Sequence, residues 1–165
     1  MSGRRVFFSF HYEGDVWRAT NVRNAGKVDA AAAAGWDDAS LWEDAKRKGK
    51  TEIEYLIDSG LKGTSVTAVL IGSETASRPW VTYEIEKSIE RGNGLLGVRI
   101  HGIRDQDSHR SKRGSVPKAL NGYRVYDWHG GSFGRWVEHA AIDAGKPCLA
   151  HDRKKCVICR WLWWW

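Results

Sequence analysis

Residues 66–103 have the sequence VTAVLIGSETASRPWVTYEIEKSIERGNGLLGVRIHGI, and this stretch gives the clearest indication of the fold. It opens with a continuous apolar run, 66–71, which is typical of a strand buried on both faces. Pro79 then begins a helix at a position where no backbone N–H is needed, and Gly92 ends that helix. A second apolar run follows over 95–103. Strand, helix and strand in this order predict two parallel strands joined by a crossover helix.

The flanking segments continue this alternation of strands and helices. Residues 5–10 (RVFFSF) form another buried-strand pattern, whereas residues 123–128 (YRVYDW) alternate more, as an edge strand would. Helices are predicted from Asp15, as the N-cap, to about Gly26, and over 37–47, 50–61 and 132–144. Residues 27–34 are ambiguous between helix and strand. The predicted fold class is therefore α/β, with a doubly wound, mostly parallel sheet of four or five strands and helices on both faces.

Length and charge limit the functional classes. The 165 residues fit one domain, over 1–145, followed by a basic tail rich in Cys and Trp over 146–165. The tail holds five basic residues and one acidic residue, so it carries most of the net charge of +6. The domain itself is not basic enough to predict nucleic-acid binding. No apolar run reaches the length of a membrane span, and the N-terminus lacks the features of a signal peptide, so we predict a cytoplasmic protein.

The tail contains four residues of the types that bind zinc, namely Cys148, His151, Cys156 and Cys159. The two paired spacings suit a tetrahedral site, but the gap between the pairs is short. The alternative is a tail without metal, in which the tryptophans of 161–165 pack onto the domain, mediate self-association or touch a membrane surface. The sequence leaves these alternatives open.

Glu84 is the leading catalytic candidate, because it lies four residues after Trp80 on the helix that begins at Pro79. Residues four apart share a helix face, so the indole ring can lie beside the carboxylate. The helix follows a buried strand, so Glu84 can point toward the edge of the sheet where doubly wound proteins bind ligands. An apolar neighbour would raise the pKa of this carboxyl and exclude water. The alternative is an amphipathic helix with Glu84 in solvent, as we expect for Glu86 and Glu90.

A second group of candidate side chains lies at the end of the first predicted strand. Residues 8–12 (FSFHY) place aromatic, hydroxyl and imidazole groups just before a helix N-terminus, which favours anionic groups such as a diphosphate. The glycines of the dinucleotide-binding G-x-G-x-x-G pattern are absent. We predict substrate contacts from Phe8, Ser9, Phe10 and His11; the alternative for His11 is a purely structural histidine.

Two segments together resemble a known family. Residues 4–26 (RRVFFSFHYEGDVWRATNVRNAG) and 63–100 (GTSVTAVLIGSETASRPWVTYEIEKSIERGNGLLGVRI) look like the TIR-like domain of the Thoeris antiphage system, its signal-producing subunit. The resemblance covers about residues 4–145. It implies the flavodoxin-like architecture and an enzyme that cleaves the nicotinamide–ribose bond of NAD+. The catalytic glutamate of the family's W-x-x-x-E pattern maps onto Glu84, and its tryptophan onto Trp80.

The resemblance also implies the product and the partners. The expected product is a cyclic or conjugated ADP-ribose that activates a separate effector, with a phage-derived activator and a homo-oligomeric enzyme. NAD+ is then a substrate, and no separate cofactor is expected. Ser9 and His11 would hold ribose or phosphate oxygens, and Asp38 lies where the family carries a loop over the nucleotide. Phe8, Phe10, Trp80 and Tyr83 would form a dry aromatic pocket.

Cleavage of this bond suits a single carboxylate. Departure of nicotinamide neutralises its pyridinium charge, so no acid is needed, and the transition state resembles an oxocarbenium ion that a carboxylate stabilises. Two alternatives use the same fold: a TIR-like scaffold that binds nucleotide or protein without turnover, and an enzyme similar to nucleoside deoxyribosyltransferases, which carry a nucleophilic glutamate. Release of nicotinamide from NAD+ separates the NAD+-cleaving enzyme from the scaffold, and exchange of deoxynucleosides would indicate the deoxyribosyltransferase.

Overall fold

The computed structural model describes residues 4–25, 29–30 and 39–148. Its strands are β1 (Arg5–Ser9), β2 (Asp29–Ala30), β3 (Val66–Ile71), β4 (Gly94–Arg99) and β5 (Arg124–Asp127). Its α-helices are α1 (Tyr12–Ala25), α2 (Ala39–Lys48), α3 (Lys50–Leu61), α4 (Pro79–Glu90) and α5 (Phe133–Asp143). Asp38 lies outside the described residues, as do His151, Cys156, Cys159 and the tryptophans of 161–165, so the expectations for them stay predictions.

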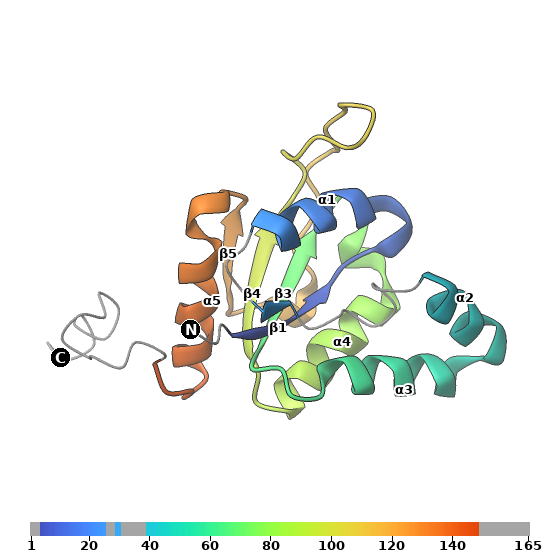
Figure 1. The fold of residues 1–165 in the computed structure, drawn as a ribbon, viewed down its shortest axis with the longest axis horizontal. Coiled ribbons are helices and arrows are strands. Elements are labelled where there is room, and N and C mark those ends of the chain that lie inside the picture. Colours follow the sequence, from blue (N-terminus) through green and yellow to red (C-terminus); the bar gives the residue numbers. More distant parts are fainter. Residues whose placement is uncertain (1–3, 26–28, 31–38, 149–165) are drawn as a thin grey trace, which may run out of the picture.

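The strands form one parallel sheet in the order β2-β1-β3-β4-β5 (Figure 1). The predicted α/β class is confirmed, and β5 lies at the edge of the sheet as its alternating pattern indicated. The chain passes from β1 outward to β2 and then returns to β3 on the other side of β1. The crevice of a doubly wound sheet lies at such a reversal, beyond the carboxyl ends of the two strands that flank it. Here those strands are β1 and β3.

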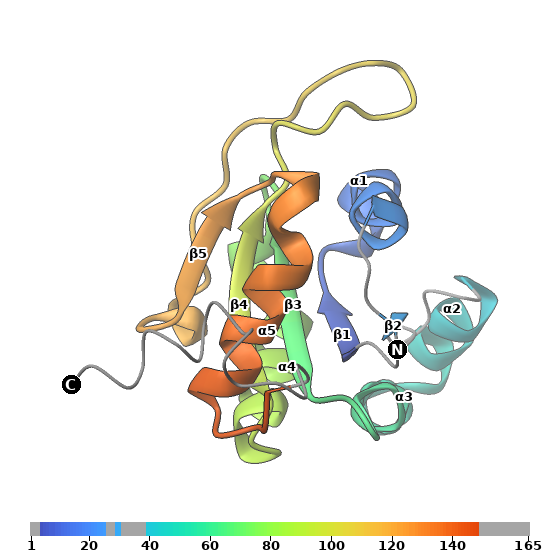
Figure 2. The same cartoon turned by 60° about the vertical axis from the view of Figure 1, so that its left-hand side comes forward.

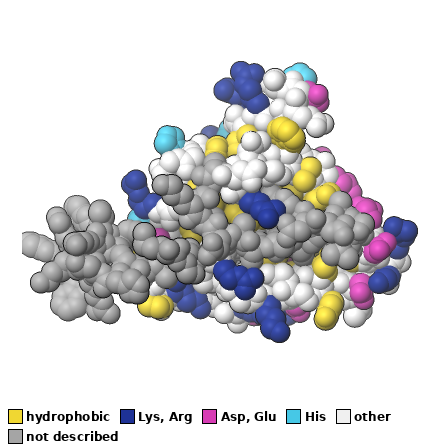
Figure 3. All heavy atoms as spheres, in the orientation of Figure 1, with side chains coloured by type: hydrophobic (Ala, Val, Ile, Leu, Met, Phe, Trp, Pro, Cys, Tyr) yellow, Lys and Arg dark blue, Asp and Glu magenta, His cyan; other side chains and the backbone are white. Residues whose placement is uncertain are grey.

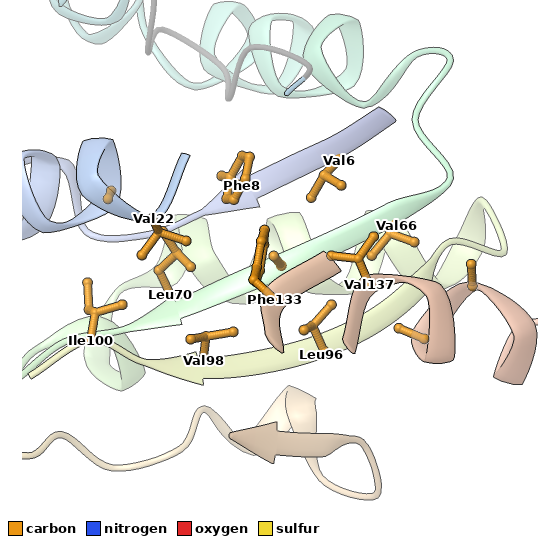
Figure 4. Packing of buried hydrophobic residues seen from close by; sticks show 14 residues of the cluster. Val6, Phe8, Val22, Val66, Leu70, Leu96, Val98, Ile100, Phe133 and Val137 are labelled. Atoms are coloured by element: carbon orange, nitrogen blue, oxygen red, sulfur yellow. The ribbon is translucent and has the colours of Figure 1, made fainter. Parts of the chain in front are cut away.

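Helices cover both faces of the sheet. Figure 2 shows α5 in front of β3 and β4 and α4 behind them. Successive residues of a strand point to opposite faces, so Val6 and Phe8 face α1 and α5, where they join Phe133 in the largest cluster of the core (Figure 4). Phe7 points to the opposite face and packs with Ile57 of α3. Ser9 points to that same face.

Two element boundaries differ from the sequence prediction. Helix α1 begins at Tyr12, because the N–H of Asp15 already donates to the carbonyl of His11 at 3.0 Å. Asp15 is therefore not the N-cap, and its buried carboxyl lies so close to Gly72 that a Cβ there would approach it within 2.0 Å. Strand β4 ends at Arg99 rather than at residue 103, because the chain turns and the N–H of Ile103 donates to the carbonyl of Ile100. Residues 29–30 of the ambiguous segment form the short β2.

Among the described residues, no helix has both the length and the apolar character required to cross a membrane.

Candidate active site

The structure brings Ser9 and Glu84 together in the interior, at the carboxyl end of β1. Ser9 is the last residue of β1 and faces α4, where Glu84 lies one turn after Trp80. The Ser9 hydroxyl donates a hydrogen bond to Oε2 of Glu84 at 2.5 Å, and both side chains are buried. The two residues are 75 positions apart in the sequence, so the strand–helix packing alone creates this pair.

Burial changes the charge state of Glu84. Loss of contact with water raises the pKa of this carboxyl to about 8, although the hydrogen bond from Ser9 acts in the opposite direction. No cation contributes to the environment of the carboxyl in the described part of the chain. Near neutral pH most molecules therefore carry Glu84 protonated. A cation placed beside it would favour the carboxylate.

A chain of buried hydrogen bonds fixes the helix that carries Glu84. The Ser88 hydroxyl donates to the backbone carbonyl of Glu84 at 2.7 Å and lies 2.7 Å from the Thr67 hydroxyl of β3. The Asn93 side chain donates to the hydroxyls of Thr67 and Thr64 at 3.3 and 2.9 Å. We call Thr64, Thr67, Ser88 and Asn93 the polar ladder. It ties α4 to β3 at defined hydrogen-bond distances, so it also sets the height of Glu84 above the sheet.

A small pocket opens between β1 and the start of α4. It has a volume of about 170 Å³, and its lining combines aromatic with charged side chains: Phe10, His11, Tyr12, Glu13, Lys46, Arg78, Pro79 and Trp80. Pockets that enclose a drug-sized ligand usually measure about 300–1,000 Å³. The pocket is therefore too small to enclose a ligand of that size. It lies at the end of the sheet that carries Ser9 and Glu84, neither of which is among its lining residues.

Charged groups surround His11 at the rim of this pocket. Its Nδ1 lies 3.6 Å from a carboxylate oxygen of Glu74, and its Nε2 lies 3.9 Å from one of Glu13. Arg78 pairs with Glu74, and Lys46 pairs with Glu13 at 2.9 Å. Burial, and next the charge of Arg78, lowers the pKa of His11 below its usual value. His11 is therefore mostly neutral near pH 7, and the positive charges of Arg78 and Lys46 are balanced by the carboxylates of Glu74 and Glu13.

The remaining predicted site residues fall into two groups. Phe10 and Trp80 line the pocket. The rings of Trp80 and Tyr83 meet edge to face, with their centroids 5.7 Å apart, and both side chains pack against α3. Phe8 does not belong to the site. Its side chain is fully buried on the opposite face of the sheet and stacks on Phe133 at 5.9 Å, because it alternates with Ser9 along β1. A substrate pocket that includes Phe8 was therefore a wrong prediction.

Arg78 and Lys46 line the pocket, although neither was predicted from the sequence as a site residue. Arg78 directly precedes Pro79 at the start of α4, and the residue before such a helix lies at the carboxyl edge of the sheet. The position of Arg78 just before this helix could therefore have identified it as a pocket residue from the sequence. Lys46 is one of several basic residues in α2, and nothing in the sequence distinguishes it from Arg47 or Lys48.

Comparison with known proteins decides the family. The family model described as "Thoeris protein ThsB, TIR-like domain" matches residues 7–105, which contain Ser9, the pocket rim and Glu84. The chain belongs to the Thoeris ThsB family. A member from Bacillus cereus (strain MSX-D12), named "Putative cyclic ADP-D-ribose synthase ThsB1", is 43% identical over 148 residues. The match covers 82% of this chain and 75% of that protein.

Proposed function

We propose that this protein is a ThsB-type synthase of cyclic ADP-ribose, which consumes NAD+ and releases nicotinamide in Thoeris antiphage defence. Family membership and the name of the Bacillus cereus relative support the activity. One observation supports the assignment of the site: Glu84 is a buried carboxyl, bonded to Ser9, beside the pocket at the switch point of the sheet. Cyclic ADP-ribose then diffuses to a separate effector, and a phage-derived component triggers its synthesis.

The first chemical step breaks the bond between C1″ of the ribose and the nicotinamide nitrogen. The bonding electron pair leaves with nicotinamide, which becomes neutral, and the ribose becomes an oxocarbenium ion. Glu84, as the carboxylate, lies beside this cation and stabilises it. The pyridinium of NAD+ is itself a cation, so its arrival lowers the pKa of Glu84 and releases the proton that the carboxyl holds in the free enzyme.

Ser9 is a positioning residue in this scheme. Its hydroxyl donates to Oε2 of Glu84, which orients the carboxylate and favours its ionised form. Arg78 and Lys46 line the same pocket, and we assign them the diphosphate, because guanidinium and ammonium groups are the usual partners of phosphate oxygens. His11, which is neutral near pH 7, can donate one hydrogen bond to a ribose or phosphate oxygen.

The second step closes the ring. A nucleophilic atom elsewhere in the ADP-ribose attacks C1″, and the proton displaced by this attack passes to Glu84 or to solvent. Water competes for the same carbon. Phe10 and Trp80, whose side chains line the pocket, exclude water from the cation and so favour cyclisation over hydrolysis. Because the described pocket is small, we also propose that self-association completes the nucleotide site.

The test is to incubate the purified chain with NAD+ and to identify the products by mass spectrometry, with and without lysate of phage-infected cells. Nicotinamide and a cyclic ADP-ribose should form together. Glu84→Gln should abolish both, whereas Glu86→Gln, an exposed position on the same helix, should leave them unchanged. Signal production by Glu84→Gln at the parental rate would contradict the assignment, and exchange of deoxynucleosides without nicotinamide release would indicate a deoxyribosyltransferase instead.

A further inference from the structure

A second, larger pocket lies at the carboxyl ends of β4 and β5. Its volume is about 380 Å³, and six side chains that line it are Arg99, His101, Ile103, Arg113, Asp127 and Trp128. Arg99 and Asp127 are direct neighbours across the two parallel strands. The pocket is therefore built on the rigid sheet, at the edge where doubly wound proteins bind their ligands. Its size falls within the usual range of about 300–1,000 Å³ for small-molecule sites.

Polar atoms at this pocket have no partner among the described residues. Nε of Arg99 and Nδ1 of His101 are buried without a hydrogen bond, and so is the hydroxyl of Ser111, whose N–H donates to the carbonyl of His101. Arg99 forms no ion pair within the described part of the chain, whereas Arg113 lies 3.6 Å from Asp127. Buried polar groups normally find a partner, so the two unpaired nitrogens in the lining of this pocket, those of Arg99 and His101, indicate a polar ligand with acceptor oxygens for Arg99.

The loop between β4 and β5 contributes Ile103 and Arg113 to this pocket, whose lining shares no residue with the pocket beside Glu84. Gly114 of this loop packs onto the residue that follows β3, because a Cβ at Gly114 would lie 1.8 Å from the carbonyl oxygen of Gly72. Arg18 of α1 anchors the same loop through hydrogen bonds to the carbonyl of Ile103 and to Asp105. The loop rises above the sheet in Figure 1 and carries basic, acidic and histidine side chains at its tip (Figure 3). A ligand of the β4–β5 pocket is thus distinct from the substrate at β1.

The chemistry of the lining identifies the class of ligand. Two arginines against one aspartate leave a net positive charge, and an arginine presents a planar fork of donors that matches phosphate oxygens. Trp128 is partly buried and offers an indole beside these charges, against which a purine can stack. We infer that the β4–β5 pocket binds a mononucleotide, with its phosphate at Arg99 and Arg113 and its base at Trp128. The site is separate from the catalytic one and does not depend on the proposed function.

Calorimetric titration of the full chain with AMP tests this site, with inorganic phosphate and adenosine as the two partial ligands. AMP should bind with a single site and more tightly than either part. Arg99→Gln and Arg113→Gln should each weaken AMP by about ten-fold or more, the loss expected for one charge-assisted contact. Arg110→Gln removes the same charge from an exposed position of the same loop and should leave the affinity unchanged.

Three outcomes would overturn the inference. The first is no heat of binding with AMP up to about 1 mM. The second is an affinity that falls with Arg78→Gln but not with Arg99→Gln or Arg113→Gln, since AMP would then occupy the Glu84 site. The third is adenosine or phosphate binding as tightly as AMP. Arg113 is more than half exposed, so Arg113→Gln gives a readout even if Arg99→Gln does not fold. Nicotinamide release by Arg113→Gln reports separately on the proposed function.

Discussion

Replacing Glu84 with Gln should stabilise the protein at alkaline pH while it removes activity. The native carboxyl has a pKa of about 8, whereas the ordinary value is 4.5. The native state therefore holds a proton that the unfolded chain has already released. This proton's contribution to stability is complete below pH 4.5 and is lost as the pH rises toward 8. The difference between the two pKa values corresponds to roughly 5 kcal/mol, a large fraction of a typical domain's stability.

The glutamine of the Glu84→Gln variant has no proton to lose, so the variant should lack this pH dependence. Urea unfolding of both chains between about pH 5 and pH 9 measures it. The free energy of unfolding of the parent, relative to Glu84→Gln, should fall by about 1.4 kcal/mol per pH unit until the pH approaches 8 and then level off. Glu86→Gln, at an exposed position of α4, is the control and should follow the parent at every pH. Parallel curves for the parent and Glu84→Gln would refute the claim that Glu84 is protonated and desolvated in the native state.

Three further predictions follow from the same contacts. Ser9→Ala removes the hydrogen bond that lowers the pKa of Glu84, so the alkaline rise of kcat/KM for NAD+ should move to higher pH; an unchanged pH–rate profile would argue against this coupling. Arg78→Gln should raise the KM for NAD+ by about ten-fold and change kcat much less, measured by nicotinamide release, and a loss confined to kcat would remove Arg78 from the diphosphate. Gly114→Ala should destabilise the chain by about 1–3 kcal/mol in thermal unfolding, because its Cβ would collide with the Gly72 carbonyl, whereas Gly102→Ala, with open space around it, should cost much less.

The fold was predictable from the sequence because its signals are local. The apolar runs of β1 and β3, and Pro79 with Gly92 around α4, each act within a few residues, and the structure confirms these elements. The element boundaries that were predicted wrongly depend on contacts between residues far apart in the sequence. Asp15 looks like an N-cap by residue type, but its carboxyl is instead buried beside Gly72, 57 positions later in the chain.

The candidate site was predictable only in part, for a related reason. Spacing along α4 placed Glu84 beside Trp80, and it became the catalytic candidate only together with the position of α4 after a buried strand and the family resemblance. The alternation that turns Ser9 toward Glu84 turns Phe8 away, so strict use of the strand period would have excluded Phe8. The charged residues at the rim of the pocket were harder to identify from the sequence. Lys46 reaches the pocket only because α2 folds back beside Glu13, and no local pattern encodes that approach.

The polar ladder limits which amino-acid substitutions members of the family can accept at its positions. Hydrophobic contacts tolerate many side chains of similar volume, but Thr67, Ser88 and Asn93 each depend on the hydroxyl or amide of a neighbour. A replacement at one of these positions leaves its partners without a hydrogen bond. Single substitutions here should therefore be rare, and simultaneous substitution of two partners should be more common. We therefore expect these three positions to covary among ThsB sequences, because together they hold α4 against β3.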